Sequence, residues 1–204
     1  LLASSLLLAL DNESSAKYRD SCQKKGIEID YARMNGMTHE ELFSHFYKFK
    51  KVSKKNDGWE IAYSKSDYTG TKLEFDIIDS ETGKLYANSG EKFNITVQKK
   101  IEEDSVKKIL LTNDNIKQKF LAKDLFDSKT GIIFFEAGEE IDDNVLNHLV
   151  DKDISEIEIL DINSNQQGAY IRNTFFADKN KNRNDAITEI YKILRPGEPP
   201  TVEA

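Results

Sequence analysis

The spacing of hydrophobic residues changes along the chain and predicts first helices, then strands, then a helix again. Leu1 to Leu10 is almost entirely apolar. From Leu42 to Tyr47 the apolar side chains recur at helical spacing, which predicts a helix that runs to about Lys50. Thr38 and Glu41 precede this pattern as a capping box, in which each side chain bonds the other residue's backbone N–H.

A β-hairpin is predicted directly after this helix. The turn-forming sequence Asn56-Asp57-Gly58 separates two segments with strand character, Phe49–Lys54 and Trp59–Tyr63. Apolar side chains alternate in the second segment, at Trp59, Ile61 and Tyr63, as expected for a half-buried strand.

An internal repeat occupies the middle of the chain. Asp76–Gly83 aligns without a gap on Asp124–Gly131, at a shift of 48 residues, and the register continues through residues 76–114 and 124–162. Each copy is predicted to form a strand, a Thr-Gly turn, a strand, a Gly-Glu turn, a short helix and a final strand. Residues 115–123 connect the copies. The repeat therefore predicts two related ββαβ units with apolar residues inside and carboxylates outside.

The motif Asp-Ser-x-Thr-Gly, which occurs in both copies, is interpreted as turn chemistry. Asp79 and Asp127 can accept hydrogen bonds from their own backbone two residues on, and Gly83 and Gly131 can adopt a positive φ. These roles explain the motif without a metal or phosphate site.

The first 37 residues contain an apolar and a polar part. Leu1–Leu10 is expected to be a buried helix of a protein cut at Leu1; it lacks a basic start and a cleavage site, and it is too short to span a bilayer. Residues 11–37 are expected to be a surface insertion with a short helix around Ala16–Lys25.

The composition excludes several classes of protein. A net charge of −7 argues against a protein that binds nucleic acid over its whole surface, so any DNA contact must be local. The single cysteine, Cys22, excludes an internal disulfide and fits a reducing cytoplasm. The three histidines, His39, His45 and His148, show no metal-ligand spacing, and no catalytic motif is recognisable.

The segment from Asp178 to Glu189 imitates a calcium loop. Oxygen-bearing side chains occupy positions 1, 3, 5 and 12, but Arg183 stands at position 6, where the sharp turn needs Gly. We therefore interpret the segment as a polar turn with Asn182 as the N-cap of a helix. Four residues are expected to form the buried stripe of that helix: Ile187, Ile190, Tyr191 and Leu194.

The end of the chain, GAYIRNT followed by a D-K-N loop, IYKIL and RPGEPPT, resembles the lobe of the β subunit of bacterial DNA-directed RNA polymerase. The repeat resembles the external domain inserted into this lobe in proteobacterial enzymes. The resemblance implies an α+β fold: a discontinuous, mostly helical lobe interrupted by two duplicated ββαβ units. The expected boundaries are 1–52 and 164–204 for the lobe and 53–163 for the insert.

This resemblance also implies a function. The parent enzyme is a nucleotidyltransferase that copies a DNA template, with magnesium held by the partner β′ subunit, and this part contributes no catalytic residue, cofactor or metal site. The isolated fragment is expected to be inactive. The lobe would form a wall of the downstream DNA channel, and the acidic insert would offer a contact surface for regulators or neighbouring subunits.

The resemblance implies several partners: the β′, α, ω and σ subunits, promoter and downstream DNA, and transcription regulators. It also implies a cytoplasmic location and no contact with a membrane. Arg195, held by the following prolines, would reach the non-template strand. The other DNA-proximal candidates are Arg183, Lys179, Lys181 and Arg172.

For the basic cluster, the spacing alone also allows a solvated helix end, with Lys192 and Arg195 opposite the helix dipole. An alternative for the whole chain is an independent, secreted binding module without enzymatic activity, in which the first ten residues are a truncated signal peptide. This alternative predicts a short parent gene and no DNA dependence.

Overall fold

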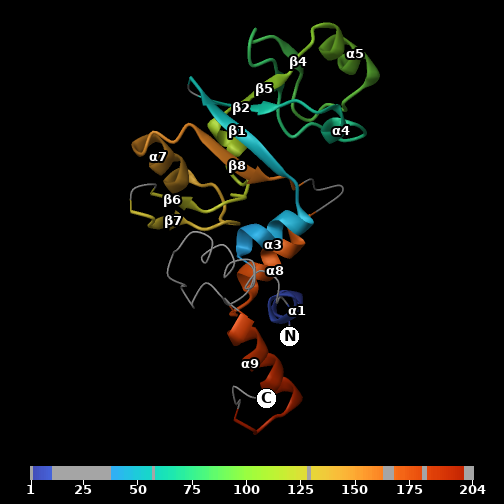
Figure 1. Cartoon of the computed structure of the whole chain (residues 1–204). Coiled ribbons are helices and arrows are strands. Elements are labelled where there is room, and N and C mark those ends of the chain that lie inside the picture. The colour runs from blue at the N-terminus through green and yellow to red at the C-terminus, as the bar shows by residue number, and fades with distance from the viewer. Residues whose placement is uncertain are drawn as a thin grey trace, which may run out of the picture. The chain divides into compact units, whose positions relative to one another are not determined.

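The computed structural model divides the chain into two compact units, one formed by residues 47–168 and the other by residues 1–46 and 169–204 (Figure 1). The chain combines helices with antiparallel sheets, which confirms the expected α+β fold. The expected surface insertion 11–37, with its helix around Ala16–Lys25, lies outside the described residues. The structure describes residues 2–10, 38–56, 58–127, 130–162, 168–180 and 183–199.

A four-stranded antiparallel sheet organises the unit 47–168. Its strands are β1 (Phe49–Lys55), β2 (Gly58–Ala62), β5 (Lys108–Leu111) and β8 (Glu156–Leu160), in the order β5-β2-β1-β8. The predicted hairpin is therefore confirmed as β1–β2, at the centre of the sheet. The register aligns one buried apolar side chain from each strand in a row across the sheet: Ile109, Ile61, Val52 and Ile157.

The sheet also explains why the helix before it is shorter than predicted. Helix α3 (His39–Phe46) begins with the predicted capping box, since Glu41 N donates to Thr38 Oγ1 at 3.2 Å and Thr38 N donates to Glu41 Oε2 at 3.0 Å. The helix does not continue to Lys50, because from Phe49 onward the chain is strand β1, paired with β2 and β8. The expected boundary between residues 52 and 53 consequently falls inside β1, whereas the compact unit starts at Tyr47.

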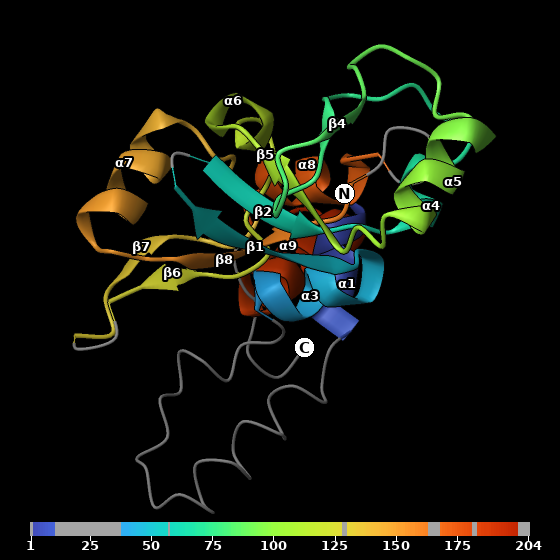
Figure 2. The same cartoon turned by 90° about the horizontal axis from the view of Figure 1, so that it is seen from above.

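Each copy of the repeat forms the expected succession of elements. The first copy contains β3 (Ile77–Ile78), β4 (Leu85–Ala87), α5 (Ile95–Glu103) and β5; the second contains β6 (Leu125–Phe126), β7 (Ile133–Phe135), α7 (Asp143–Asp151) and β8. Figures 1 and 2 show α5 beside β4 on one side of the β1–β2 hairpin and α7 beside β6 and β7 on the other. The final strands of the two copies thus flank the same central hairpin.

Hydrogen bonds recur between the copies at the same shift of 48 residues. Gly83 and Gly131 have φ angles of +72° and +71°, and both donate to the aspartate carbonyl four residues earlier, at 2.9 and 2.7 Å. Asp79 accepts from the backbone of Glu81 and Thr82, as predicted. In the second copy, Asp127 Oδ1 likewise accepts a hydrogen bond from the backbone N–H of Thr130.

The structural repeat begins earlier than the sequence repeat. Helix α4 (Lys65–Tyr68) and helix α6 (Asn113–Ile116) are four-residue helices that start 48 positions apart. Thr112 caps α6 through a reciprocal bond with Asn115. Residues 115–123 are therefore more than a connection, because α6, the second copy's equivalent of α4, extends into them.

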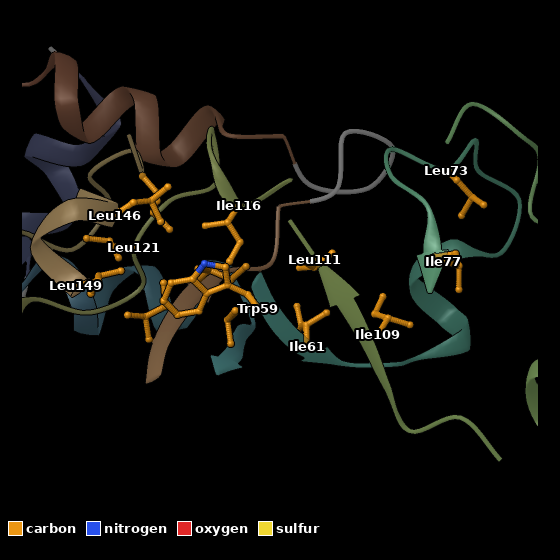
Figure 3. Close-up of a cluster of buried hydrophobic side chains, with 14 of the residues drawn as sticks. Trp59, Ile61, Leu73, Ile77, Ile109, Leu111, Ile116, Leu121, Leu146 and Leu149 are labelled. Carbon is orange, nitrogen blue, oxygen red and sulfur yellow. The ribbon is translucent and has the colours of Figure 1, made fainter. Parts of the chain in front are cut away.

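Both copies share one hydrophobic core around the sheet. Trp59, which is 2% exposed, lies in the middle of this cluster, with residues of the first copy on one side and of the second on the other (Figure 3). Its indole Nε1 donates to Asn113 Oδ1 at 2.9 Å, so its polar atom is satisfied within the core. The insert-like unit is thus a single folded body rather than two separate lobes.

In the described residues of the second unit, all the regular elements are helices. Together with α3 it contains α1 (Ala3–Leu10), α8 (Tyr170–Ala177) and α9 (Arg183–Leu194), and α1 packs against both α8 and α9. The predicted helix in Leu1–Leu10 is confirmed, although only Ser4, Ser5 and Leu8 are buried.

The predicted buried stripe of α9 is wrong. Ala186 is the residue that this helix buries, whereas Ile187 and Leu194 are 37% and 75% exposed. The other two residues of the predicted stripe, Ile190 and Tyr191, are half-buried, so the helix does not bury the continuous stripe that the spacing indicated. In the described parts of the chain no helix is long and apolar enough to cross a membrane.

Candidate nucleic-acid interface and its supporting network

A buried hydrogen-bond network links helix α1 to the loop between α8 and α9 and to helix α9. The carboxylate of Asp178, 5% exposed, accepts hydrogen bonds from the hydroxyl of Ser4, from Ser5 Oγ at 2.7 Å and from Asn180 N at 3.0 Å. Asn180 donates from Nδ2 to Ser5 Oγ at 3.1 Å and to the carboxylate of Glu189 in α9. Direct hydrogen bonds between side chains therefore hold the loop between α8 and α9 to α1.

The network keeps Asp178 charged. Burial alone would raise the pKa of this carboxyl, but the bonds from Ser4, the Asn180 backbone and Ser5 outweigh burial and hold the pKa below the ordinary value of 3.8. Three donors converge on one buried carboxylate, so the carboxylate cannot be replaced by an apolar group without leaving them unsatisfied.

The same geometry accounts for the calcium-like spacing. Asp178 and Asn180, at the first and third positions, are bonded to α1, and helix α9 begins at Arg183 where the loop would need its glycine turn. The proposed N-cap, Asn182, lies outside the described residues. Across the part of the chain that the structure describes, no three His, Cys, Asp or Glu side chains come together to offer a metal site.

The sequence-predicted basic residues occupy two ends of α9. At its start, Arg183 donates from Nε to the carbonyl oxygen of Ala9 at 3.2 Å, and so satisfies a carbonyl in the last turn of α1. Lys179 is exposed in the preceding loop, and Lys181 lies outside the described residues. Arg172, in α8, stacks over the ring of Phe176 at 4.1 Å.

Arg195 follows the other end of α9. Its side chain is 61% exposed, and its guanidinium lies 3.6 Å from Glu198 Oε2 and stands over the ring of Tyr191 at 5.6 Å. The turn continues through Pro196 and Gly197, whose φ of +91° suits only glycine without strain. The arginine is thus presented at the surface by a short, restrained turn.

The structure does not gather these cations into one cluster. Helix α9 has 12 residues, and at 1.5 Å per residue Arg183 and Arg195 are separated by about 18 Å along its axis. The helix therefore presents positive charge at each end rather than a single basic patch.

A second polar centre, in the unit 47–168, was not found from the sequence. Lys50 Nζ lies 2.8 Å from both Asp67 and Asp161, and all three side chains are largely buried. Burial opposes the charge of Lys50, yet the two carboxylates outweigh it and raise the pKa of the lysine above 10.5. The centre lines a cavity of about 100 Å³ whose floor includes Ile61 and Leu111.

Neither polar centre has a local sequence signal. Asp178 and Ser4 are 174 positions apart, and Lys50 and Asp161 meet only because β1 pairs with β8. The two adjacent serines in the Leu-rich first helix were the available hint, since buried hydroxyls require partners.

Comparison with known proteins identifies the chain as part of a much longer protein. No protein-family model matches it. It is 45% identical over 198 residues to a protein of Bartonella quintana, and 40% and 48% identical over 169 residues to proteins of Caulobacter vibrioides and Brucella canis. These matches cover 95%, 83% and 83% of this chain, and 14%, 12% and 12% of the relatives.

All three relatives are DNA-directed RNA polymerase β subunits. The chain belongs to this family, as a segment of the subunit, and the resemblance found in the sequence is confirmed. The alternative of an independent module with a short parent gene is not supported, because the relatives are several times longer than this chain.

Proposed function

We propose that the helical unit is the lobe of the β subunit and forms part of the wall along which downstream DNA passes. The unit 47–168 is then the inserted external domain. The chain has a net charge of −7 and repels nucleic acid as a whole, so DNA must meet a local positive site.

The observation that carries this proposal is the presentation of Arg195. Its side chain is exposed and lies 3.6 Å from the equally exposed carboxylate of Glu198, and such surface pairs are weak enough for a phosphate to replace the carboxylate. Arg183, about 18 Å away at the other end of α9, would then lie near phosphates about five nucleotides further along one strand, with Lys179 in the loop before it. Arg172 and Lys181 complete the proposed set.

The parent enzyme supplies the chemistry. In this proposal the complex of β with β′, α, ω and σ polymerises ribonucleotides in the cytoplasm, and β′ holds the magnesium. In this proposal the segment positions DNA and takes no part in bond formation. The insert is proposed to contact regulators or neighbouring subunits.

The experiment compares Arg195→Ala with Lys54→Ala in the assembled polymerase. Lys54 is an exposed lysine on strand β1 of the insert. Open complexes formed by the Arg195 variant should dissociate faster and show a smaller dependence on salt concentration, because one phosphate contact is lost. Equal behaviour of the two variants would contradict the proposed DNA contact. Factor responses that survive removal of residues 59–162 unchanged would contradict the role of the insert.

A further inference from the structure

The two copies of the repeat share a fold but differ in charge. Residues 76–114 contain eight Asp and Glu and six Lys, whereas residues 124–162 contain twelve Asp and Glu and two Lys. The second copy therefore carries a net charge of −10, against −2 for the first. Since the backbone hydrogen bonds of the copies agree, the folding of the unit does not require this difference.

The second copy also exposes more apolar side chains on its hairpin than the first, which has Lys84 and the half-buried Ile78 at two of the three positions and an exposed Leu85 at the third. Phe126 and Ile133 are cross-strand partners in the β6–β7 hairpin and are 58% and 47% exposed. Ile132, 59% exposed, occupies the position of Lys84, which in the first copy pairs with Asp104 at 2.5 Å. We call Phe126, Ile132 and Ile133 the apolar hairpin surface.

Two phenylalanines of this hairpin are already packed against helix α7. Phe134 and Phe135 contact the ring of His148 in α7, with centroids 4.3 and 5.4 Å apart, and Lys152 Nζ stands over Phe134 at 5.1 Å. Figure 1 shows α7 alongside β6 and β7. The hairpin is thus held in place by α7, so its exposed side chains are presented on a fixed support.

Exposed carboxylates lie at the end of the helix that packs against this hairpin. Asp151 follows His148 by about one helical turn and therefore lies on the hairpin side of α7. Asp153 comes two residues later, after Lys152, and both carboxylates are exposed. Exposed apolar side chains on a strongly acidic unit are unsuited to DNA, because the carboxylates would repel its phosphates. They suit a protein segment that combines apolar residues with lysine or arginine.

We propose that the apolar hairpin surface is the docking site for a basic, apolar segment of a protein partner. The inference rests on the proposed role of the insert as a contact surface and assigns that role to the second copy. The apolar side chains of the partner would cover Phe126 and Ile133, while its cations would face the carboxylates of α7 and the following turn. The first copy, with Lys84 tied to Asp104, would not bind the same partner.

The test uses assembled polymerase whose β subunit contains this sequence, and three fluorescent peptides of equal length. One alternates Lys with Leu and Phe, the second alternates Lys with Ser, and the third alternates Glu with Leu and Phe. The pair Ile133→Ser and Leu85→Ser gives a matched control, because these residues are equivalent in the two copies and are 47% and 49% exposed. Peptide anisotropy is measured for each enzyme.

We expect the Lys/Leu/Phe peptide alone to bind tightly, the Ile133 variant to weaken it about tenfold, and the Leu85 variant to bind as the parent does. Asp151→Asn combined with Asp153→Asn should weaken binding and reduce its salt dependence. Equal binding of the Lys/Ser peptide, or unchanged binding by the Ile133 variant, would overturn the proposal. The effect of removing residues 59–162 on factor responses is a separate result, so the insert could remain a contact surface while this particular site is refuted.

Discussion

Replacing Asp178 tests the network that joins the first helix to the loop before α9. Asp178→Ala removes the acceptor for two hydroxyls and one backbone N–H within the buried part of the helical unit. Each buried donor left without a partner costs about 1–3 kcal/mol, but rotating hydroxyls recover part of this, so we expect a loss of about 3 kcal/mol in the free energy of unfolding.

The charge of Asp178 adds a pH dependence with a definite sign. The pKa of the folded carboxyl lies below the unfolded value of 3.8, so its stabilising contribution is fully present above that value. The contribution is lost as the pH falls through the folded pKa. Asp178→Asn should remove this part of the acid sensitivity, since the amide does not titrate.

Urea unfolding followed by circular dichroism gives the free energy, and hydrogen exchange with mass spectrometry shows where it is lost. Protection should fall in peptides from α1, α8 and α9 and remain in peptides from the four-stranded sheet. Ser4→Ala with Ser5→Ala provides the control, because removing the donors should cost much less once Asp178 is already Ala. Strictly additive effects, or a loss below about 0.5 kcal/mol, would refute the network.

Two further predictions concern the unit 47–168. Lys50→Met leaves Asp67 and Asp161 close together and largely buried without their shared cation, and should lower the free energy of unfolding by about 3 kcal/mol in a urea titration. Because the pKa of Lys50 is raised in the folded state, the parent should hold this advantage below pH 10.5 and lose it as the pH rises through the folded pKa. Equal stability of the two proteins at pH 7 would contradict a stabilising role for Lys50. Gly83→Ala and Gly131→Ala should each cost about 1 kcal/mol, since both positions have positive φ and space for a methyl group; clearly unequal losses would show that the two turns are not equivalent.

Local patterns predicted the parts of the fold that depend on local chemistry. The capping box at Thr38, the β1–β2 hairpin and the repeated Asp-Ser-x-Thr-Gly turn all use partners within a few residues, so their signals stand in the sequence. The duplication was visible because both copies keep the same turn residues at one fixed spacing.

Features that depend on distant contacts were missed. The end of α3 at Phe46 depends on pairing of β1 with β8, more than a hundred residues away, which overrides the local helical pattern. The buried face of α9 depends on α1, and the acceptor role of Asp178 depends on serines 173 and 174 positions away. Among the candidate site residues, Arg183 has a structural partner in Ala9 that spacing could not indicate.

The central proposal, that α9 and its following turn face the DNA path, is tested most directly by photocrosslinking. A photoreactive amino acid is placed at Arg195, and in a separate enzyme at Asp153 of the insert, in assembled polymerase bound to promoter DNA with each strand labelled. The account predicts a crosslink from position 195 to the non-template strand near the start of the bubble, and none from position 153. Absence of the crosslink at 195 in complexes that form open promoters normally would contradict the account.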